Sequence, residues 1–292
     1  MPDVISIVFP AFFAIFLGYL VGKTTRINVA PIVDITLYVG VPALVLISLL
    51  GKAIVFVDAA KVWVAALLIM FGCWLAAWLV FNLLRKEHAG LYIPIAMMNT
   101  MNLPFPIIFL AWGAEGLVAA TLFYIPNVIL MYTLGVYAVT GRHWKENVKE
   151  VFRQPVVYAA IVGLLLNFLG VKVPELLFGA VNFVAMMGIP LVLIVLGHNL
   201  SKVKITSFPT TLLASFMRIG VGLGIGLLAV NILNVTGLFR SVVILDSAMP
   251  AAAASTILAT KYKNEAELVS SVVFLTTLAS LVVIPFLLRM LA

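Results

Sequence analysis

The sequence predicts an all-α polytopic membrane protein in which ten transmembrane helices form two inverted repeats of five. Three observations predict this fold: an apolar composition, a series of uncharged stretches long enough to cross a bilayer, and a repeat within the chain. Of the 292 residues, 64% are hydrophobic and 10% are charged, whereas soluble domains have about 45–50% apolar and about 25% charged residues. The surplus apolar surface must therefore face lipid.

Charged residues divide the chain into the ten expected helices. An apolar helix needs about 20 residues to cross the roughly 30 Å of hydrocarbon in a bilayer. Seven uncharged intervals are close to this length or longer: 4–22, 62–84, 88–114, 116–141, 154–171, 176–201 and 268–288. Three more intervals contain a single charge each: 28–50 with Asp34, 207–235 with Arg218, and 237–260 with Asp246. The first interval lacks the basic start and the small-residue cleavage site of a signal peptide, so we expect a retained helix.

Basic residues predict that both termini lie outside the cytoplasm. The loops after the first, third, fifth, seventh and ninth helices hold 12 Lys and Arg residues, and the other side holds 5. Because short cytoplasmic loops are enriched in Lys and Arg, the first set faces the cytoplasm of a cell whose plasma membrane the chain would cross. The connection 141–153 then becomes a cytoplasmic linker with a short amphipathic helix. The apolar face of that helix would consist of Trp144, Val148, Val151 and Phe152.

The chain resembles itself at an offset of roughly 145 residues. Three matches occur in the same order: 40–47 with 188–195, Pro10 and Gly18 with Pro155 and Gly163, and Pro106 with Pro250. The halves 1–140 and 154–292 would each carry five helices. Because an odd number sends the second half into the membrane from the opposite side, the repeat is inverted, which is a transporter architecture.

Prolines break one expected helix in each half. The interval 88–114 contains Pro104 and Pro106 in mid-span, and neither can continue a regular helix. Pro250 has the same effect in the second half. Non-helical backbone within a bilayer persists only where protein or a cavity satisfies it, and proline is favourable as the first residue of a new half-helix. We therefore expect two half-helix N-termini to meet at a substrate site that includes Pro106 and Pro250 and whose partial positive charge suits a carboxylate.

The first break resembles a family motif. Residues 99–106 read Asn-Thr-Met-Asn-Leu-Pro-Phe-Pro and resemble the Asn-Thr-Gly-Asn-Leu-Gly-Leu-Pro crossover of the auxin efflux carrier family, which includes the plant PIN carriers and prokaryotic carboxylate permeases. Further segments continue the resemblance over nearly the whole chain: 112–117, Asn127, 132–135, 153–155, 188–190, 196–197 and 249–250. This sequence departs from the family in having Met101 and Pro104 where glycine is common, and Ala254 where many members carry asparagine.

The resemblance implies a fold similar to that of bile-acid/sodium symporters and sodium/proton antiporters. In it, the first, second, sixth and seventh helices form a scaffold, which is often the interface of a homodimer. The other six helices form a moving transport domain that contains the crossover. The resemblance also implies transport of an organic anion, with Asn99 and Asn102 near its carboxylate.

Each candidate binding residue also has a structural interpretation. Asn99 and Asn102 either contact the substrate or satisfy backbone groups freed at the break, and both roles can hold together. Asn127 either lines the site or forms an interhelical hydrogen bond. Ser255 and Thr256, the nearest polar replacements for the family's asparagine at 254, either contribute to the site or pack between helices.

Two charged residues within the expected helices are candidates for coupling or for charge compensation, because charge inside a membrane is costly and is usually functional. Asp246 either carries a coupling proton or sodium ion, pairs with Arg218, or lies only at the membrane interface near Arg240. Arg218 either supplies a counter-charge or extends to the cytoplasmic surface.

These observations predict a secondary transporter of a small organic anion, auxin-like or malate-like, that works by elevator-type alternating access in the direction of efflux. The alternatives are a proton- or sodium-coupled carboxylate uptake permease and, in another class, a passive channel or a membrane sensor. The sequence contains no nucleotide-binding loop and no His-Glu-x-x-His motif, so neither ATP coupling nor enzymatic activity is expected. A single cysteine, Cys73, argues against a Cys-based metal site, and no cofactor is expected. The dispersed basic residues argue against nucleic acid as a partner.

Overall fold

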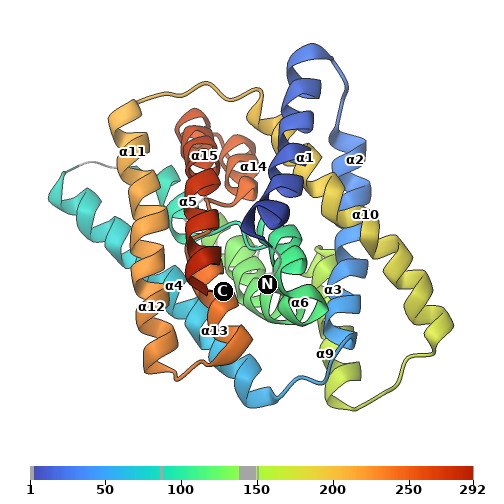
Figure 1. Ribbon diagram of the computed structural model, residues 1–292. Helices are drawn as coiled ribbons and strands as arrows, with labels where there is room; N and C mark the ends of the chain where they lie inside the picture. Colours follow the sequence, from blue (N-terminus) through green and yellow to red (C-terminus); the bar gives the residue numbers. More distant parts are fainter. Residues whose placement is uncertain (1–2, 86–87, 138–148, 150, 292) are drawn as a thin grey trace.

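The computed structural model describes residues 3–85, 88–137, 149 and 151–291, which fold into helices joined by short connections (Figure 1). Seven helices in this part of the chain are long and apolar enough to cross a membrane: Val4–Thr24, Ala30–Leu50, Phe56–Leu83, Pro104–Gly135, Glu175–Leu200, Phe208–Ile232 and Ala266–Leu291. The prediction of a polytopic helical membrane protein is therefore confirmed. Trp144 and Val148 of the predicted linker helix lie outside the described residues.

Two of the long helices contain a wider, π-helical turn. In the first, α2 (Ala30–Ile35) and α3 (Val41–Leu50) are joined by the turn Thr36–Gly40. Pro42 follows it and has no N–H group to donate to the preceding turn, which is a usual cause of such irregularity. In the second, the turn Met217–Val221 joins α11 (Phe208–Phe216) to α12 (Gly222–Ile232) and contains Arg218.

The predicted break in the first half lies between α5 and α6. After α4 (Phe56–Leu83), a short helical turn at Ala89–Leu91 leads into α5 (Tyr92–Ala96), and helix resumes only at α6 (Pro104–Leu130). Pro104 is the first residue of α6, where its missing N–H costs nothing. The expected loop near Glu115 is reduced to a bend within α6 at Gly113, whose φ of 66° favours glycine.

The predicted break in the second half lies between α13 (Gly237–Ser247) and α14 (Ala253–Lys261). Pro250 lies in the non-helical segment itself, whereas Pro106, its expected repeat partner, lies within the first turn of α6. The two prolines therefore differ in their local structure, and Pro104 rather than Pro106 begins the first half-helix. The chain ends with α15 (Ala266–Leu291), which lies beside α14 at the centre of Figure 1.

Glycines allow a close contact between two helices. Five helices gather on one side of Figure 1: α2, α3, α1 (Val4–Thr24), α9 (Pro155–Phe168) and α10 (Glu175–Leu200). A Cβ atom on Gly18 of α1 would lie 2.0 Å from the carbonyl oxygen of Ile194 in α10. One on Gly197 of α10 would lie 1.9 Å from the carbonyl oxygen of Ile15. Any side chain at either position would push the two backbones apart, so α1 and α10 are held as a close pair.

Candidate functional site

The two helix breaks cross each other and share backbone hydrogen bonds. Met98 and Ala251 form an isolated antiparallel bridge. The Asn99 N–H donates to the Pro250 carbonyl oxygen at 2.7 Å, and the Ala252 N–H donates to the Met97 carbonyl oxygen at 3.0 Å. Backbone groups that leave a helix inside a membrane need such partners. The breaks therefore meet, as the sequence predicts, and each satisfies part of the other.

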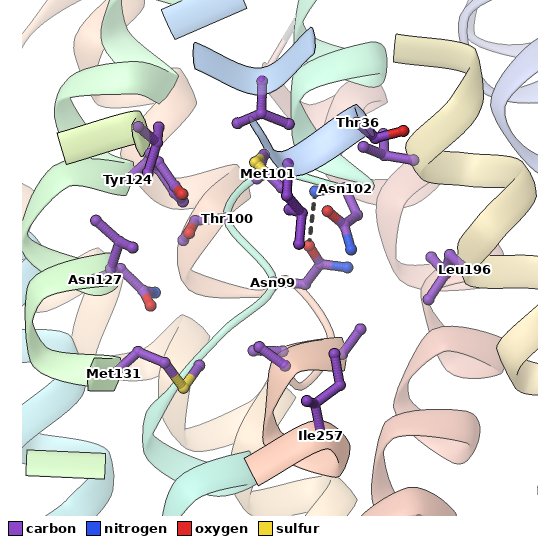
Figure 2. A pocket seen from close by; sticks show the side chains of 18 of the residues that line it. Thr36, Asn99, Thr100, Met101, Asn102, Tyr124, Asn127, Met131, Leu196 and Ile257 are labelled. Carbon is purple, nitrogen blue, oxygen red and sulfur yellow. Dashed lines mark hydrogen bonds between the residues drawn. The ribbon is translucent and has the colours of Figure 1, made fainter. Parts of the chain in front are cut away.

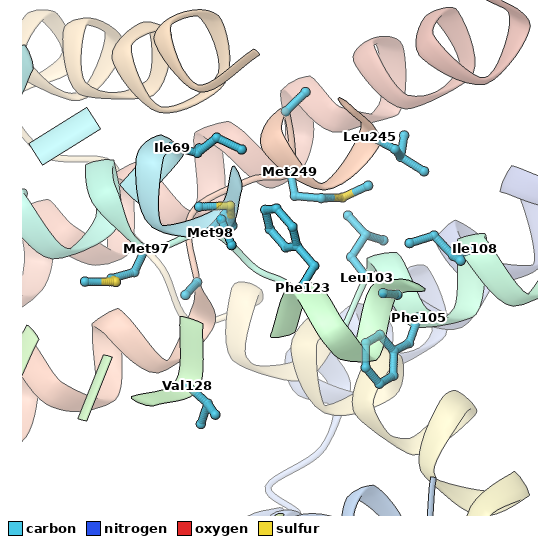
Figure 3. Close-up of a cluster of buried hydrophobic side chains, with 14 of the residues drawn as sticks. Ile69, Met97, Met98, Leu103, Phe105, Ile108, Phe123, Val128, Leu245 and Met249 are labelled. Carbon is cyan, nitrogen blue, oxygen red and sulfur yellow. The ribbon is translucent and has the colours of Figure 1, made fainter. Parts of the chain in front are cut away.

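Tight apolar packing surrounds part of the crossing. Figure 3 shows Phe123 of α6 beside Met249 and Leu103 from the two breaks. These three side chains are fully buried, as are Met97 and Met98. A core of this density transmits small displacements instead of absorbing them, so the crossing should move as one unit.

A cavity of about 170 Å³ lies in front of the crossing. It separates the break from the π-helical turn Thr36–Gly40 and from α10, and Figure 2 shows Asn99 and Asn102 together near the centre of the view and Asn127 on α6 at the left. Most of its lining is apolar, with side chains of Val, Leu, Ile and Met. No charged side chain lines it in the part of the chain that the structure describes. An anion bound there would depend on amide groups and helix ends.

Asn99 satisfies a backbone group at the break and also lines the cavity. Its Oδ1 accepts a hydrogen bond of 2.9 Å from the backbone N–H of Asn102, a group freed by the break. Its Nδ2 is buried and has no hydrogen-bond partner among the described residues. Because a buried donor without a partner costs about 1–3 kcal/mol, this nitrogen is suited to a ligand. Asn102 is only partly buried and lines the same cavity.

Asn127 ties the second part of α6 to the first break. Its Nδ2 donates to the Met98 carbonyl oxygen at 3.2 Å, and the side chain is 2% exposed. It also lines the cavity. Both interpretations of this residue, interhelical hydrogen bond and position at the site, therefore agree with the structure.

The second break contributes few polar side chains to this cavity. Its residues there are Ala252, Ala253 and Ala254. Ser255 is fully buried but does not line the cavity, and Thr256 lines a neighbouring hollow. The proline residues act through the backbone, since the Pro250 carbonyl takes part in the crossing and Pro106 is buried in α6.

The two charged candidates are both fully buried and do not pair with each other. Neither oxygen of the Asp246 carboxyl group has a partner among the described residues, and no ion pair joins it to Arg218. The interfacial position considered for Asp246 and the surface position considered for Arg218 do not fit side chains that are 0% exposed. Arg218 instead donates to backbone carbonyls at the crossing. Neither charged side chain lines the cavity.

Several lining residues could not be identified from the sequence. The polar side chains at the cavity that the sequence analysis leaves out are Thr36, Thr100, Tyr124, Tyr132, Gln154 and Asn199. A further residue, Thr276 of α15, supports the second break because its Oγ1 accepts the Ala251 N–H at 3.1 Å. In the sequence, each of these residues is a polar residue within an apolar stretch. That pattern does not show which face of a helix lines the cavity.

A second hollow of about 660 Å³ adjoins the cavity. Leu196, Asn199, Ala253 and Ile257 line both. The other end of the hollow is lined by Lys202, Lys204 and Lys261, together with Glu267. These lysines belong to loops that the distribution of basic residues predicts to be cytoplasmic.

Comparisons with known proteins find similar sequences among membrane transporters. The family model described as membrane transport protein matches residues 145–288. The chain is 28% identical over 214 residues to the uncharacterized transporter MJ1031 of Methanocaldococcus jannaschii, a match covering 70% of this chain and 69% of the relative. It is 29% identical over 209 residues to an uncharacterized transporter of Methanothermobacter thermautotrophicus, covering 67% of this chain and 66% of the relative. The chain thus spans the membrane with several helices and is similar, over its second half, to the membrane transport protein family and, over about two thirds of its length, to two transporters.

Proposed function

We propose that the protein is a secondary carrier of a small organic anion whose carboxylate binds in the cavity at the crossing. The observation that carries the proposal is the unpartnered Asn99 Nδ2 at the cavity wall, beside the starts of α6 and α14. Both helix N-termini carry a partial positive charge, which favours an anion. At α14 this charge comes with backbone N–H groups, whereas the first turn of α6 offers few, because Pro104 and Pro106 have none and the Phe105 N–H donates to the Met101 carbonyl oxygen. This arrangement can bind one carboxylate without a charged side chain.

The cavity favours an anion with one carboxylate and an apolar body. Beyond the crossing, its walls are formed by side chains such as Val33, Leu37, Met131 and Leu196, with the rings of Tyr124 and Tyr132. A second carboxylate would lie among these groups without a cation to compensate it, which is costly. We therefore expect an apolar monocarboxylate to bind more tightly than a dicarboxylate such as malate.

Reciprocal contacts support the proposal of ten helices in two inverted repeats. Gly40 and Gly188 occupy matching positions of the repeated segments, and a Cβ atom on Gly40 would lie 3.3 Å from the Cα of Gly188. Gly18 packs on the backbone of Ile194, and its repeat partner Gly163 packs on the side chains of Leu49 and of Leu46, the repeat partner of Ile194. Such mutual contacts are those that a two-fold relation between halves would produce.

The proposed mechanism is displacement of the crossing against a scaffold of α1, α2, α3, α9 and α10, which would also form a homodimer interface. The hollow beside Lys202 would be the cytoplasmic access route. On the opposite side, Lys52 after α3 forms an ion pair with Glu115 of α6, which joins the two bodies. The structure would then represent an inward-facing state.

Efflux of a monoanion is the proposed direction. An inside-negative potential drives an anion outward by about 2.3 kcal/mol per charge for each 100 mV, so no coupling ion is needed. Proton-coupled uptake is the alternative favoured by one observation, the buried and unpartnered Asp246. In proteoliposomes, Asp246→Asn should abolish the dependence of flux on a pH gradient if that alternative holds, and should leave it unchanged under efflux without coupling.

A thermal-shift screen of the purified protein against mono- and dicarboxylates tests the proposed binding site. We expect apolar monocarboxylates to raise the Tm of the wild type, and the shift to shrink in Asn102→Ala. Asn82→Ala, which changes an exposed asparagine at the end of α4, is the matched control and should keep the full shift. If no carboxylate stabilises the wild type more than Asn102→Ala, the proposed anion site is wrong.

A further inference from the structure

Arg218 lies on the side of the crossing where the half-helices end. Its Nη1 donates to the carbonyl oxygen of Ile95 at 2.8 Å and to that of Ala96 at 3.4 Å. Its Nη2 donates to the carbonyl oxygen of Ser247 at 2.6 Å. Ala96 is the last residue of α5 and Ser247 the last of α13. One guanidinium group therefore bridges the C-terminal ends of both broken helices.

These carbonyl groups form the electronegative side of the crossing. The last carbonyls of a helix have no partner within it and carry the negative end of the helix dipole. In transporters with broken helices, such C-terminal ends and unwound carbonyls bind the coupling cation. Here the planar fork of an arginine, which keeps its charge when buried, already occupies them.

The next turns of the same long helix leave room for this group at two glycines. A Cβ atom on Gly222 would lie 2.0 Å from Arg218 Nη2 and 2.5 Å from the Ser247 carbonyl oxygen. A Cβ atom on Gly226, one turn later, would lie 2.2 Å from Ser247 Oγ. Gly224, on another face of α12, has nothing within 4 Å of the corresponding position. The space beside the guanidinium is thus specific to the face of α12 that meets the crossing.

We propose that Arg218 is the resident cation of the crossing. It holds the C-terminal ends of α5 and α13 together and takes the position that a dissociable monovalent cation would otherwise occupy. It is a positioning residue, since it does not line the cavity. The inference rests on the crossing itself and stands whichever substrate the cavity binds.

Chemical rescue of Arg218→Ala tests the inference without any substrate. The variant frees three carbonyls and leaves a space of the shape of a guanidinium group, so its Tm should be lower than that of the wild type. Guanidinium chloride at a few millimolar should restore at least half of the loss, and sodium chloride should restore a smaller part. Tetramethylammonium chloride at equal ionic strength should restore none. Equal rescue by all three salts, or no loss of Tm, would overturn the proposal, because a merely space-filling role gives no cation selectivity.

The wild type and a pair of glycine variants provide measurements that do not need the arginine to be removed. Sodium should not raise the Tm of the wild type more than potassium or choline does, and a sodium-specific rise would overturn the proposal. Gly222→Ala should displace the guanidinium and lower the Tm. Gly224→Ala, the matched change on the same helix, should have the Tm of the wild type. Equal Tm values for the two variants would also overturn the proposal, even if carboxylate binding at the cavity had been demonstrated.

Discussion

The two sides of the crossing satisfy their polar groups in opposite ways. On the side of the half-helix N-termini, α6 and α14 border a cavity whose wall leaves the Asn99 Nδ2 without a partner among the described residues. On the side of the C-termini, α5 and α13 end on Arg218, and Gly222 provides the space that its guanidinium group fills. The comparison suggests that the first side is arranged for a ligand that comes and goes, whereas the second is completed by the protein itself.

The largest expected effect is a loss of stability when Arg218, on the side of the helix C-termini, is replaced. Arg218→Met keeps much of the side-chain volume but removes all donors, and each buried acceptor left without a partner costs about 1–3 kcal/mol. We expect the free energy of unfolding to fall by about 3 kcal/mol or more, measured by denaturant titration in mixed micelles. Arg240→Met, which removes a hydrogen bond to Asn231 at an exposed position, should cost less than about 1 kcal/mol. Similar losses in both variants would remove the distinction between the two sides.

On the cavity side, the main effect should be on binding. Asn99→Asp keeps the Oδ1 that accepts from the Asn102 N–H but replaces the free donor with an oxygen and introduces a competing negative charge. We expect the affinity for a stabilising monocarboxylate to fall at least about tenfold, which is about 1.4 kcal/mol, as measured by isothermal titration calorimetry. An unchanged Kd would show that the carboxylate does not bind next to Asn99.

A smaller effect on stability is expected at the second break. Thr276→Val removes the acceptor of the Ala251 N–H, and an amide left buried without a partner should lower the free energy of unfolding by about 1–2 kcal/mol. Thr276→Ser keeps the hydroxyl group and should recover most of this loss. If the valine variant is as stable as the serine variant, the alanine-rich break does not depend on α15 for its hydrogen bonds.

The sequence predicts the breaks because their cause is local. Pro104 has no N–H and so begins a helix, and Pro250 lies in a segment that cannot remain helical. The crossing itself could be expected from the inverted repeat, since matched breaks that enter from opposite sides have one place to meet.

The partners of the break residues could not be predicted, because they come from distant parts of the chain. Thr276 lies 25 residues along the chain from Ala251, whose N–H donates to it. Arg218 lies 123 residues from Ile95 and 122 residues from Ala96, whose carbonyl oxygens accept from it. Charge alone favours pairing Arg218 with Asp246. The structure instead places the guanidinium on helix-end carbonyls, which have no other donor within their own helices. The residue pattern of one helix does not show whether Arg218 binds Asp246 or these carbonyl groups.

The smallest predicted effect concerns the route into the cavity. Lys202 is exposed at the outer end of the adjoining hollow, where a positive charge would attract an anion without contacting the bound state. Lys202→Gln should therefore lower the association rate of a carboxylate by about twofold at low salt, measured by stopped-flow fluorescence, with the dissociation rate unchanged. At about 0.5 M salt the difference should vanish, because screening then acts within a few ångströms. Lys172→Gln removes an exposed charge just before α10, at the opposite end of that helix from Lys202, and should leave the rate closer to that of the wild type. Equal reductions in both variants would mean that overall charge attracts the anion, and the two sides of the crossing would then differ only in how they hold it.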